Sequence, residues 1–247
     1  MNESEAWADE IEGQLRRVGS PERAATEQRY LKSELKFLGA TVRQIGRSVK
    51  AFALDHPALS HQSLVQLVTE LWSKPVHERR MVAVKLLEHY HTLLVTADLP
   101  WIERLIRESK TWAYVDVLAG DVVGRILLGD PGAAVMIDAW AVDADLWLRR
   151  SALLAELLPL RVAGSLRRFG RRADLMLDEK EFFIRKAIGW VLREAGKRHP
   201  QEVVEWLAPR AHRASGVTMR EAVKYLPAAD ALRLMEAHRE KRPAALA

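Results

Sequence analysis

Hydrophobic residues recur at spacings of three and four along almost the whole chain, and no segment alternates polar and apolar residues as a half-buried strand does. This pattern predicts an all-α protein. In the first half we expect helices over about residues 4–17, 21–35, 41–54, 60–73, 77–95, 101–106 and 109–124. In the second half we expect them over about residues 132–140, 146–158, 167–177, 179–199, 201–211, 218–226 and 227–238.

Prolines, glycines and N-capping residues divide these helices into antiparallel pairs. The pairs recur at roughly 35 to 45 residues, the period of HEAT-like and armadillo-like solenoids. They begin near Pro21, Ser60, Pro100, Pro131, Arg167 and Pro200. We therefore expect one domain over residues 1–247, an α-solenoid of HEAT-like antiparallel helix pairs with a concave basic groove, and a frayed tail at residues 239–247. An irregular helical bundle is the alternative.

Composition narrows the classes of protein. The 247 residues include no cysteine, which excludes disulfides and thiolate zinc sites. The first residues, MNESEAWADEIEGQ, are acidic where a secretory signal would be basic, and no run of about 18 apolar residues occurs. We expect a soluble, cytoplasmic protein with no membrane partner, and a monomer because no oligomerisation motif is visible.

The charge is unevenly distributed. The whole chain carries a net charge of +5, yet residues 149–198 alone contain 13 Lys and Arg against 6 Asp and Glu. Clustered cations of this kind bind nucleic-acid phosphates with sequence-independent affinity. A solvated helical surface is the plain alternative.

The segment SKTWAYVDVLAGDVVG, residues 109–124, carries the strongest candidate chemistry. Trp112 and Asp116 are four residues apart, which places the indole and the carboxylate on one helix face with Cβ atoms about 6 Å apart. Asp116 is the candidate catalytic residue, although most helix aspartates are solvated surface charges. The chain has 8 Trp against 5 Phe, and five of these tryptophans lie on apolar stripes and are expected to pack in the core: Trp7, Trp72, Trp101, Trp140 and Trp206.

A second candidate face lies on the helix expected over residues 179–199. Trp190 follows Gly189, which is expected to leave the helix face open, and it shares a stripe with Lys186, Arg193 and Lys197. This face suits a ligand that offers phosphate and a surface for stacking. Apolar contacts are expected from other positions of the helix, namely Phe182, Ile184, Ile188, Val191 and Leu192.

Arg149 and Arg150 follow Trp147 closely. One of the two is expected to bind a phosphate through the bidentate geometry of its guanidinium, and a helix-surface arginine is the alternative.

Other chemistry has little support. His89 and His91 are two apart on a helix and cannot share a metal, and no HExxH, glycine-rich phosphate loop or GxSxG elbow occurs. No cofactor or metal is expected. Gly120 and Gly124 form a GxxxG pattern that predicts close helix packing.

The sequence resembles the alkylpurine DNA glycosylases of the AlkD family over about residues 20–225. Five segments follow the same order along the chain: RYLKSELKFLGATVRQI, WAYVD, WLRRSA, EFFIRKAIGWVLREAGKRHPQEVVEW and REAVKYL. The resemblance implies a HEAT-like-repeat enzyme that excises positively charged N3- and N7-alkylated purines from double-stranded DNA. It also implies a bacterial protein associated with the nucleoid through DNA.

The family's functional residues match particular positions of this chain. The Asp and two Trp that surround the lesion's deoxyribose match Asp116, Trp112 and Trp190, the phosphate-binding Arg matches Arg150, and the N-terminal tyrosine matches Tyr30. Family members often carry another Trp and an Asp where this chain has Thr111 and Ala113, which leaves the range of accepted lesions open.

The resemblance implies that the lesion stays stacked in the duplex while the carboxylate stabilises an oxocarbenium-like sugar. Two other functions remain possible from the sequence. One is a glycosylase specialised for bulky natural-product adducts, and the other is a non-catalytic helical-repeat scaffold that binds nucleic acid or protein.

Overall fold

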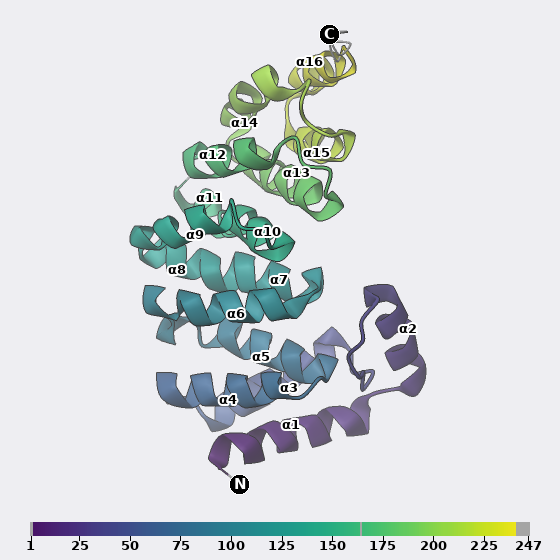
Figure 1. Cartoon of the computed structure of the whole chain (residues 1–247), viewed down its shortest axis with the longest axis vertical. Helices are drawn as coiled ribbons and strands as arrows, with labels where there is room; N and C mark the ends of the chain where they lie inside the picture. The colour runs from purple at the N-terminus through teal and green to yellow at the C-terminus, as the bar shows by residue number, and fades with distance from the viewer. Residues whose placement is uncertain (1, 164, 241–247) are drawn as a thin grey trace. The chain divides into compact units, whose positions relative to one another are not determined.

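The computed structural model describes residues 2–163 and 165–240, and over these residues it is built from helices, without any β-strand (Figure 1). An isolated parallel bridge joins Lys36 and Val76. The all-α prediction is confirmed. The predicted frayed tail begins at Arg239, which ends the last helix, and its residues 241–247 lie outside the described part of the chain.

The helices pack into two compact units. The N-terminal unit, residues 2–98 and 109–118, has 3₁₀ turns at His91–Leu93 and Thr96–Asp98 and the following helices: α1 Glu3–Val18, α2 Pro21–Leu31, α3 Val42–Asp55, α4 His61–Ser73, α5 His77–His89 and α7 Trp112–Val117. That all repeats form one domain stays a prediction.

The C-terminal unit comprises residues 99–108 and 119–240 apart from residue 164. A π-helical segment, Leu118–Val123, leads into it from α7. Its helices are α6 Leu99–Ser109, α8 Gly124–Gly129, α9 Ala134–Trp140, α10 Leu146–Leu154, α11 Leu157–Ala163, α12 Arg167–Met176, α13 Phe182–Gly196, α14 Pro200–Leu207, α15 Gly216–Ala222 and α16 Ala228–Arg239.

Side-chain caps start several helices where the sequence predicted. The Ser20 and Ser60 hydroxyls accept hydrogen bonds from backbone N–H groups in the first turns of α2 and α4. Thr41 and Gln44 form a reciprocal capping box at α3, in which the Thr41 N–H donates to Gln44 Oε1 at 2.7 Å. Local hydrogen bonds of this kind satisfy the otherwise unpaired N–H groups of a first turn.

Several helix ends differ from the prediction. α2 ends at Leu31 because Lys32 adopts a left-handed conformation with φ of 49°. α5 ends at His89 and is followed by 3₁₀ turns. The segment predicted as one helix over residues 146–158 is divided into α10 and α11.

Ion pairs within the C-terminal unit join successive helix pairs at the predicted period. Arg172 Nε donates to Asp138 Oδ1 at 2.6 Å across 34 residues, and Arg210 Nε donates to Asp174 Oδ1 at 2.6 Å across 36 residues. These contacts show that helices one repeat apart are neighbours in this unit.

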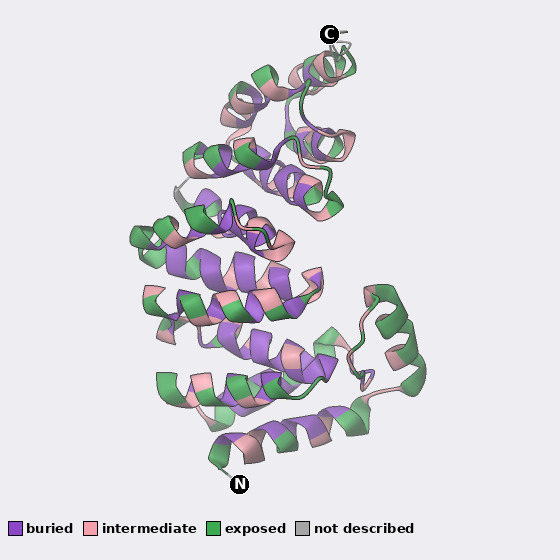
Figure 2. Ribbon diagram, viewed as in Figure 1, coloured by how far each residue is buried: buried purple, intermediate pink, exposed green. Residues whose placement is uncertain are grey.

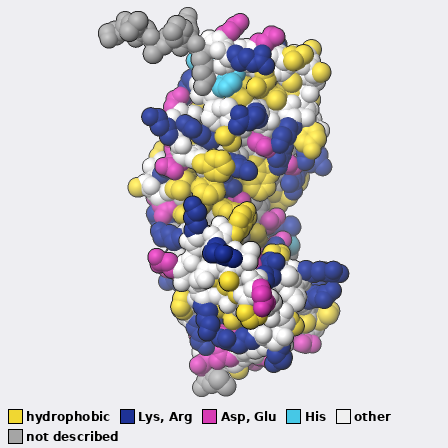
Figure 3. All heavy atoms as spheres, turned by 90° about the vertical axis from the view of Figure 1, so that its right-hand side faces the viewer, with side chains coloured by type: hydrophobic (Ala, Val, Ile, Leu, Met, Phe, Trp, Pro, Cys, Tyr) yellow, Lys and Arg dark blue, Asp and Glu magenta, His cyan; other side chains and the backbone are white. Residues whose placement is uncertain are grey.

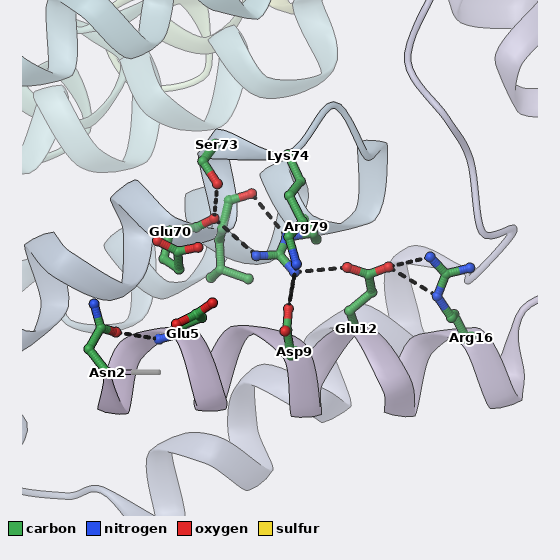
Figure 4. Close-up of polar contacts among 10 residues, drawn as sticks. Asn2, Glu5, Asp9, Glu12, Arg16, Glu70, Ser73, Lys74 and Arg79 are labelled. Carbon is green, nitrogen blue, oxygen red and sulfur yellow. Dashed lines mark hydrogen bonds and ion pairs between the residues drawn. The ribbon is translucent and has the colours of Figure 1, made fainter.

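The buried side chain of Arg79 ties three helices of the N-terminal unit together (Figure 4). Its guanidinium donates to Asp9 at 3.0 Å and Glu12 at 2.8 Å on α1, and to the Glu70 carbonyl at 3.0 Å on α4. Since Glu12 is buried as well, each charge satisfies the other inside the unit.

Tryptophan burial agrees with the prediction in part. Trp72 and Trp140 are buried. Trp7, Trp101 and Trp206 keep part of their surface exposed, but Trp7 packs against Phe52 with ring centroids 5.4 Å apart and Trp206 packs against Phe169 at 6.0 Å.

The GxxxG prediction is confirmed. A Cβ on Gly124 would lie 3.1 Å from the Ala155 carbonyl oxygen, and a Cβ on Gly120 would lie 3.6 Å from Leu157. The two glycines therefore let this helix approach the chain around α11 closely.

Candidate nucleic-acid interface

Trp112 and Asp116 lie on the less buried face of α7. Thr111 caps the helix by accepting from the Ala113 N–H, while Tyr114 and Val115 are completely buried against the N-terminal unit. Because these inward positions anchor the helix, Trp112 and Asp116 are left half-buried at a spacing of four.

The chain departs from α-helical geometry directly after this site. Leu118–Val123 forms a π-helical segment, and α8 then continues to Gly129. The helix predicted over residues 109–124 is thus present, but it is not regular and it runs further. Segments of π-helix are frequent at functional sites because they re-aim the residues around them.

Helix α2 brings Tyr30 to Trp112. Every residue of α2 keeps part of its surface exposed, and the helix is drawn apart from α1, α3 and α4 (Figures 1 and 2). The ring of Tyr30, 71% exposed, meets the Trp112 indole edge-on, with ring centroids 6.2 Å apart. Of the predicted site residues, the N-terminal unit therefore brings together Tyr30, Trp112 and Asp116.

A hollow of about 510 Å³ runs along the face of α2 that carries Tyr30. It is lined by Glu22, Arg23, Thr26, Glu27 and Tyr30. Arg23 lies outside residues 149–198, where the sequence predicted the binding cations, and it pairs with Glu27 at 3.1 Å. The spacing of positions 23, 27 and 30 along one helix face could have pointed to it.

The loop that follows α2 is fixed at its end. The buried carboxylate of Glu78 accepts hydrogen bonds from three consecutive N–H groups, those of Leu38 at 2.9 Å, Gly39 at 2.7 Å and Ala40 at 3.2 Å. Burial raises the pKa of Glu78, and the three donors act against this rise. Since Ser20 N–H also donates to the Gly39 carbonyl, both ends of the α2 segment are held at one place.

In the C-terminal unit, α13 carries the predicted cationic stripe. Trp190 and Arg193 are half-buried, whereas Lys186 and Lys197 are exposed. The Lys186 ammonium lies over the Phe182 ring at 5.8 Å. The opposite face holds Ile184, Ile188, Val191 and Leu192, all completely buried as predicted.

One expectation for α13 was wrong, and another holds only in part. Gly189 does not leave an open face, because a Cβ there would lie 2.8 Å from Glu221 Cβ and 3.0 Å from the Thr218 carbonyl, so it is the point where α15 packs closely. Phe182 supplies only part of the expected apolar contact, since its ring meets Phe183 edge-on at 5.5 Å while 53% of its surface is exposed. The glycine therefore serves packing, and the phenylalanine adds an aromatic ring to the cationic face.

The cations of the α13 stripe differ in whether a carboxylate pairs with them. Lys197 Nζ donates to Glu194 at 2.8 Å, and Arg193 pairs with Glu221 and Glu194. Lys186 has no carboxylate partner in the described part of the chain. It is the cation of the stripe that is most available to an external anion.

Arg149 and Arg150 are both held by the protein. Arg149 donates to the Glu179 carboxylate at 3.0 and 3.1 Å and to two backbone carbonyls. Arg150 is buried, donates to the Phe183 carbonyl at 2.5 Å and lies 5.7 Å from that ring. Their contact with phosphate stays a prediction.

One face of the C-terminal unit shows hydrophobic side chains bordered by Lys and Arg in its upper part (Figure 3). Aromatic and aliphatic surface next to cations suits a nucleic-acid backbone, whose sugars are apolar and whose phosphates are anionic. Among the described residues, no cluster of three His, Cys, Asp or Glu is placed to hold a metal ion.

Comparison with known proteins decides the family. The model of the DNA alkylation repair enzyme family matches residues 11–226. The chain belongs to this family. Membership identifies it as an enzyme of DNA repair whose partner is DNA. No curated protein matches the chain.

Solved structures share the fold of this family member. "Predicted DNA alkylation repair enzyme from Enterococcus faecalis" is 24% identical, with a TM-score of 0.76 over 85% of this chain and 97% of that chain. AlkD2 from Streptococcus mutans is 18% identical, with a TM-score of 0.60 over 85% of this chain and 100% of that chain. The protein smu.31 from Streptococcus mutans UA159 is 19% identical, with a TM-score of 0.57 over 75% and 98%. These likenesses confirm the helical-repeat fold.

No helix within the described residues has both the length and the apolar character needed to cross a membrane.

Proposed function

We propose that this repair enzyme is a monofunctional DNA glycosylase that hydrolyses the N-glycosidic bond of cationic N3- and N7-alkylated purines. The observation that carries the proposal is the face of α7, where the Trp112 indole and the Asp116 carboxylate are both half-buried and the Tyr30 ring meets Trp112 at 6.2 Å. A carboxylate beside aromatic rings suits a reacting sugar that becomes cationic.

The reaction requires little of the protein beyond the stabilisation of charge. An alkylated purine already carries a positive charge, so the electron pair of the C1′–N bond neutralises the departing base without a strong general acid. Asp116 stabilises the positive charge that develops at C1′ and accepts the proton of the water that attacks this carbon. The products are an abasic site and a neutral alkylpurine.

The family resemblance assigns indole faces for the sugar to Trp112 and Trp190, and the Tyr30 ring meets Trp112. Lys186 on α13 is the first candidate for a phosphate contact, because it is exposed and no carboxylate pairs with it in the described part of the chain. Arg150 is the second candidate. The protein grips the sugar and backbone, so a lesion that remains stacked can react.

The decisive experiment is single-turnover incubation with DNA that contains N7-methylguanine. Asp116→Asn should lose at least about 100-fold in the rate of base release, the size of effect typical for one electrostatic group, while binding DNA as the wild type does. Asp55→Asn removes an exposed carboxylate at the end of α3 and is the matched control.

Unchanged excision by Asp116→Asn would remove the assignment of this residue. Failure of the wild type to release any alkylated purine, small or bulky, would instead indicate that the enzyme acts on another lesion chemistry.

A further inference from the structure

We infer that Tyr114 and His77 are positioning residues that set the pose of Trp112 and Asp116 and couple it to the segment that carries α2. The catalytic part of this inference rests on the proposed glycosylase function, whereas the coupling itself does not. The two side chains are buried, polar and far apart in sequence, and no part of the proposed chemistry uses them directly.

Tyr114 lies between Trp112 and Asp116 in sequence but points the opposite way. Its side chain is completely buried, and its ring packs edge-on against Trp72 with centroids 5.8 Å apart. Its hydroxyl lies 2.6 Å from His77 Nδ1 and 3.3 Å from the His77 carbonyl. A rotation of α7 about its axis would break this short hydrogen bond, so the bond fixes which way Trp112 and Asp116 face.

His77 is a suitable neutral partner for that hydroxyl. Burial, with a smaller effect from the Arg23 charge, lowers the pKa of His77 to about 4, so the ring is neutral at physiological pH. Burial also raises the pKa of Tyr114, which keeps its proton. Two neutral groups therefore share the hydrogen bond between the hydroxyl and Nδ1, and the histidine tautomer decides which of them donates.

The far side of His77 meets the loop that returns from α2. The Phe37 ring stacks on the imidazole with centroids 4.3 Å apart and an interplanar angle of 9°. The His77 N–H donates to the Lys36 carbonyl at 2.8 Å, and the adjacent Glu78 binds the N–H groups of residues 38–40. The loop after α2 and the helix of the candidate site are thus joined through one imidazole.

Two contacts consequently connect α2 with Trp112. Tyr30 touches the indole directly, and the stack of Phe37 on His77 reaches the same helix through Tyr114. A ligand that moves α2 would change the geometry of both contacts. We therefore expect engagement of α2 by DNA to be sensed at the indole and the carboxylate.

The test separates pose from stability with two buried tyrosines. Tyr114→Phe removes the hydroxyl and keeps the ring. Tyr90→Phe is the matched control, because Tyr90 is also buried in the N-terminal unit and donates to the His56 carbonyl at 2.9 Å, a partner outside α7. His77→Leu removes the partner of the hydroxyl, and His77→Asn returns an amide group near the position of Nδ1.

The first readout needs no activity. With 5-fluorotryptophan in the eight tryptophan positions, the ¹⁹F resonance of Trp112 is assigned by its loss in Trp112→Phe. Tyr114→Phe and His77→Leu should shift or broaden this resonance, Tyr90→Phe should leave it in place, and His77→Asn should restore most of the wild-type position.

The second readout is single-turnover excision of N7-methylguanine, compared with the dissociation constant for the same DNA. Tyr114→Phe should reduce the rate about tenfold with binding changed less than about twofold, because small misplacements of a reacting group are costly to rate. Tyr90→Phe should change neither quantity.

The outcomes are distinguishable. An unmoved Trp112 resonance in Tyr114→Phe overturns the positioning role, whatever the activity. An equal loss of rate in Tyr90→Phe also overturns it, since general destabilisation would then explain the effect. If Tyr114→Phe shifts the Trp112 resonance but the wild-type protein excises no purine, the glycosylase proposal is refuted and the coupling is supported.

Discussion

At the scale of single residues, α5 begins with a polar run that is buried. His77, Glu78 and Arg79 have exposures of 3%, 0% and 0%, although their side chains would suit a surface. Each is satisfied by a group from a distant part of the N-terminal unit, as a buried polar group requires. Stability should therefore depend on these residues more than hydropathy indicates.

Removing Arg79 tests this dependence. Arg79→Met keeps much of the side-chain volume but leaves the buried Glu12 carboxylate without this partner, so the free energy of unfolding should fall by about 3 kcal/mol. Arg17→Met removes an exposed arginine of α1 and should change stability by less than about 0.5 kcal/mol. Equal effects of the two substitutions in chemical denaturation would contradict the structural role of Arg79.

His77 predicts a pH dependence of stability. Its folded pKa of about 4 lies below the ordinary value of 6.5, so between these values the unfolded state binds the extra proton. The free energy of unfolding should fall as pH drops from 7 towards 4, and His77 contributes at most about 3 kcal/mol of this fall.

The contribution of His77 is isolated by comparison with His77→Asn, because other groups titrate in both proteins. The difference in stability between the two proteins should change across this window and stay constant above pH 7. A constant difference from pH 4 to 8 would show that His77 is not buried in neutral form.

At the scale of elements, the position of α2 depends on the loops at its two ends. All of its residues are partly exposed, so packing contributes little to its position. Gly39 has φ of +81°, and a Cβ there would lie 1.9 Å from the Ser20 carbonyl oxygen. This residue lets the two ends of the α2 segment meet, and only glycine fits there without strain.

Gly39→Ala should therefore loosen the α2 segment. We expect a loss of about 1 to 3 kcal/mol in stability and reduced hydrogen-exchange protection at the base of the segment, residues 20–21 and 36–40. Gly46→Ala in α3, where a Cβ would meet nothing within 4 Å, should stabilise the protein by about 0.5 to 1 kcal/mol. Retained protection in Gly39→Ala would show that α2 is held by other contacts.

At the scale of the whole molecule, the net charge of +5 and membership in a DNA repair family make DNA affinity dependent on salt. Not every cation should contribute equally. An ammonium that is already paired with a carboxylate offers less charge to a phosphate than an unpaired one.

Lys186 and Lys197 give a matched comparison on α13. Lys186→Ala should reduce the slope of log affinity against log salt by about 1, whereas Lys197→Ala should reduce it less, because Glu194 lies 2.8 Å from the Lys197 ammonium. Fluorescence anisotropy with duplex DNA at several salt concentrations measures both slopes. Equal reductions would show that the Glu194 pair opens when DNA binds.

The sequence by itself determined the helices, several of their caps, the repeat spacing and the shared face of Trp112 and Asp116. All of these follow from periodicities and hydrogen bonds that span a few residues. The family resemblance that it carries is confirmed.

Only the tertiary structure decided which polar residues are buried and what satisfies them. The Tyr114 hydroxyl meets His77 across 37 residues, and Glu78 meets the loop after α2 across about 40. Gly189 serves the close packing of α15 rather than an open face. These outcomes depend on how distant helices approach one another, and no local pattern of residues encodes that approach.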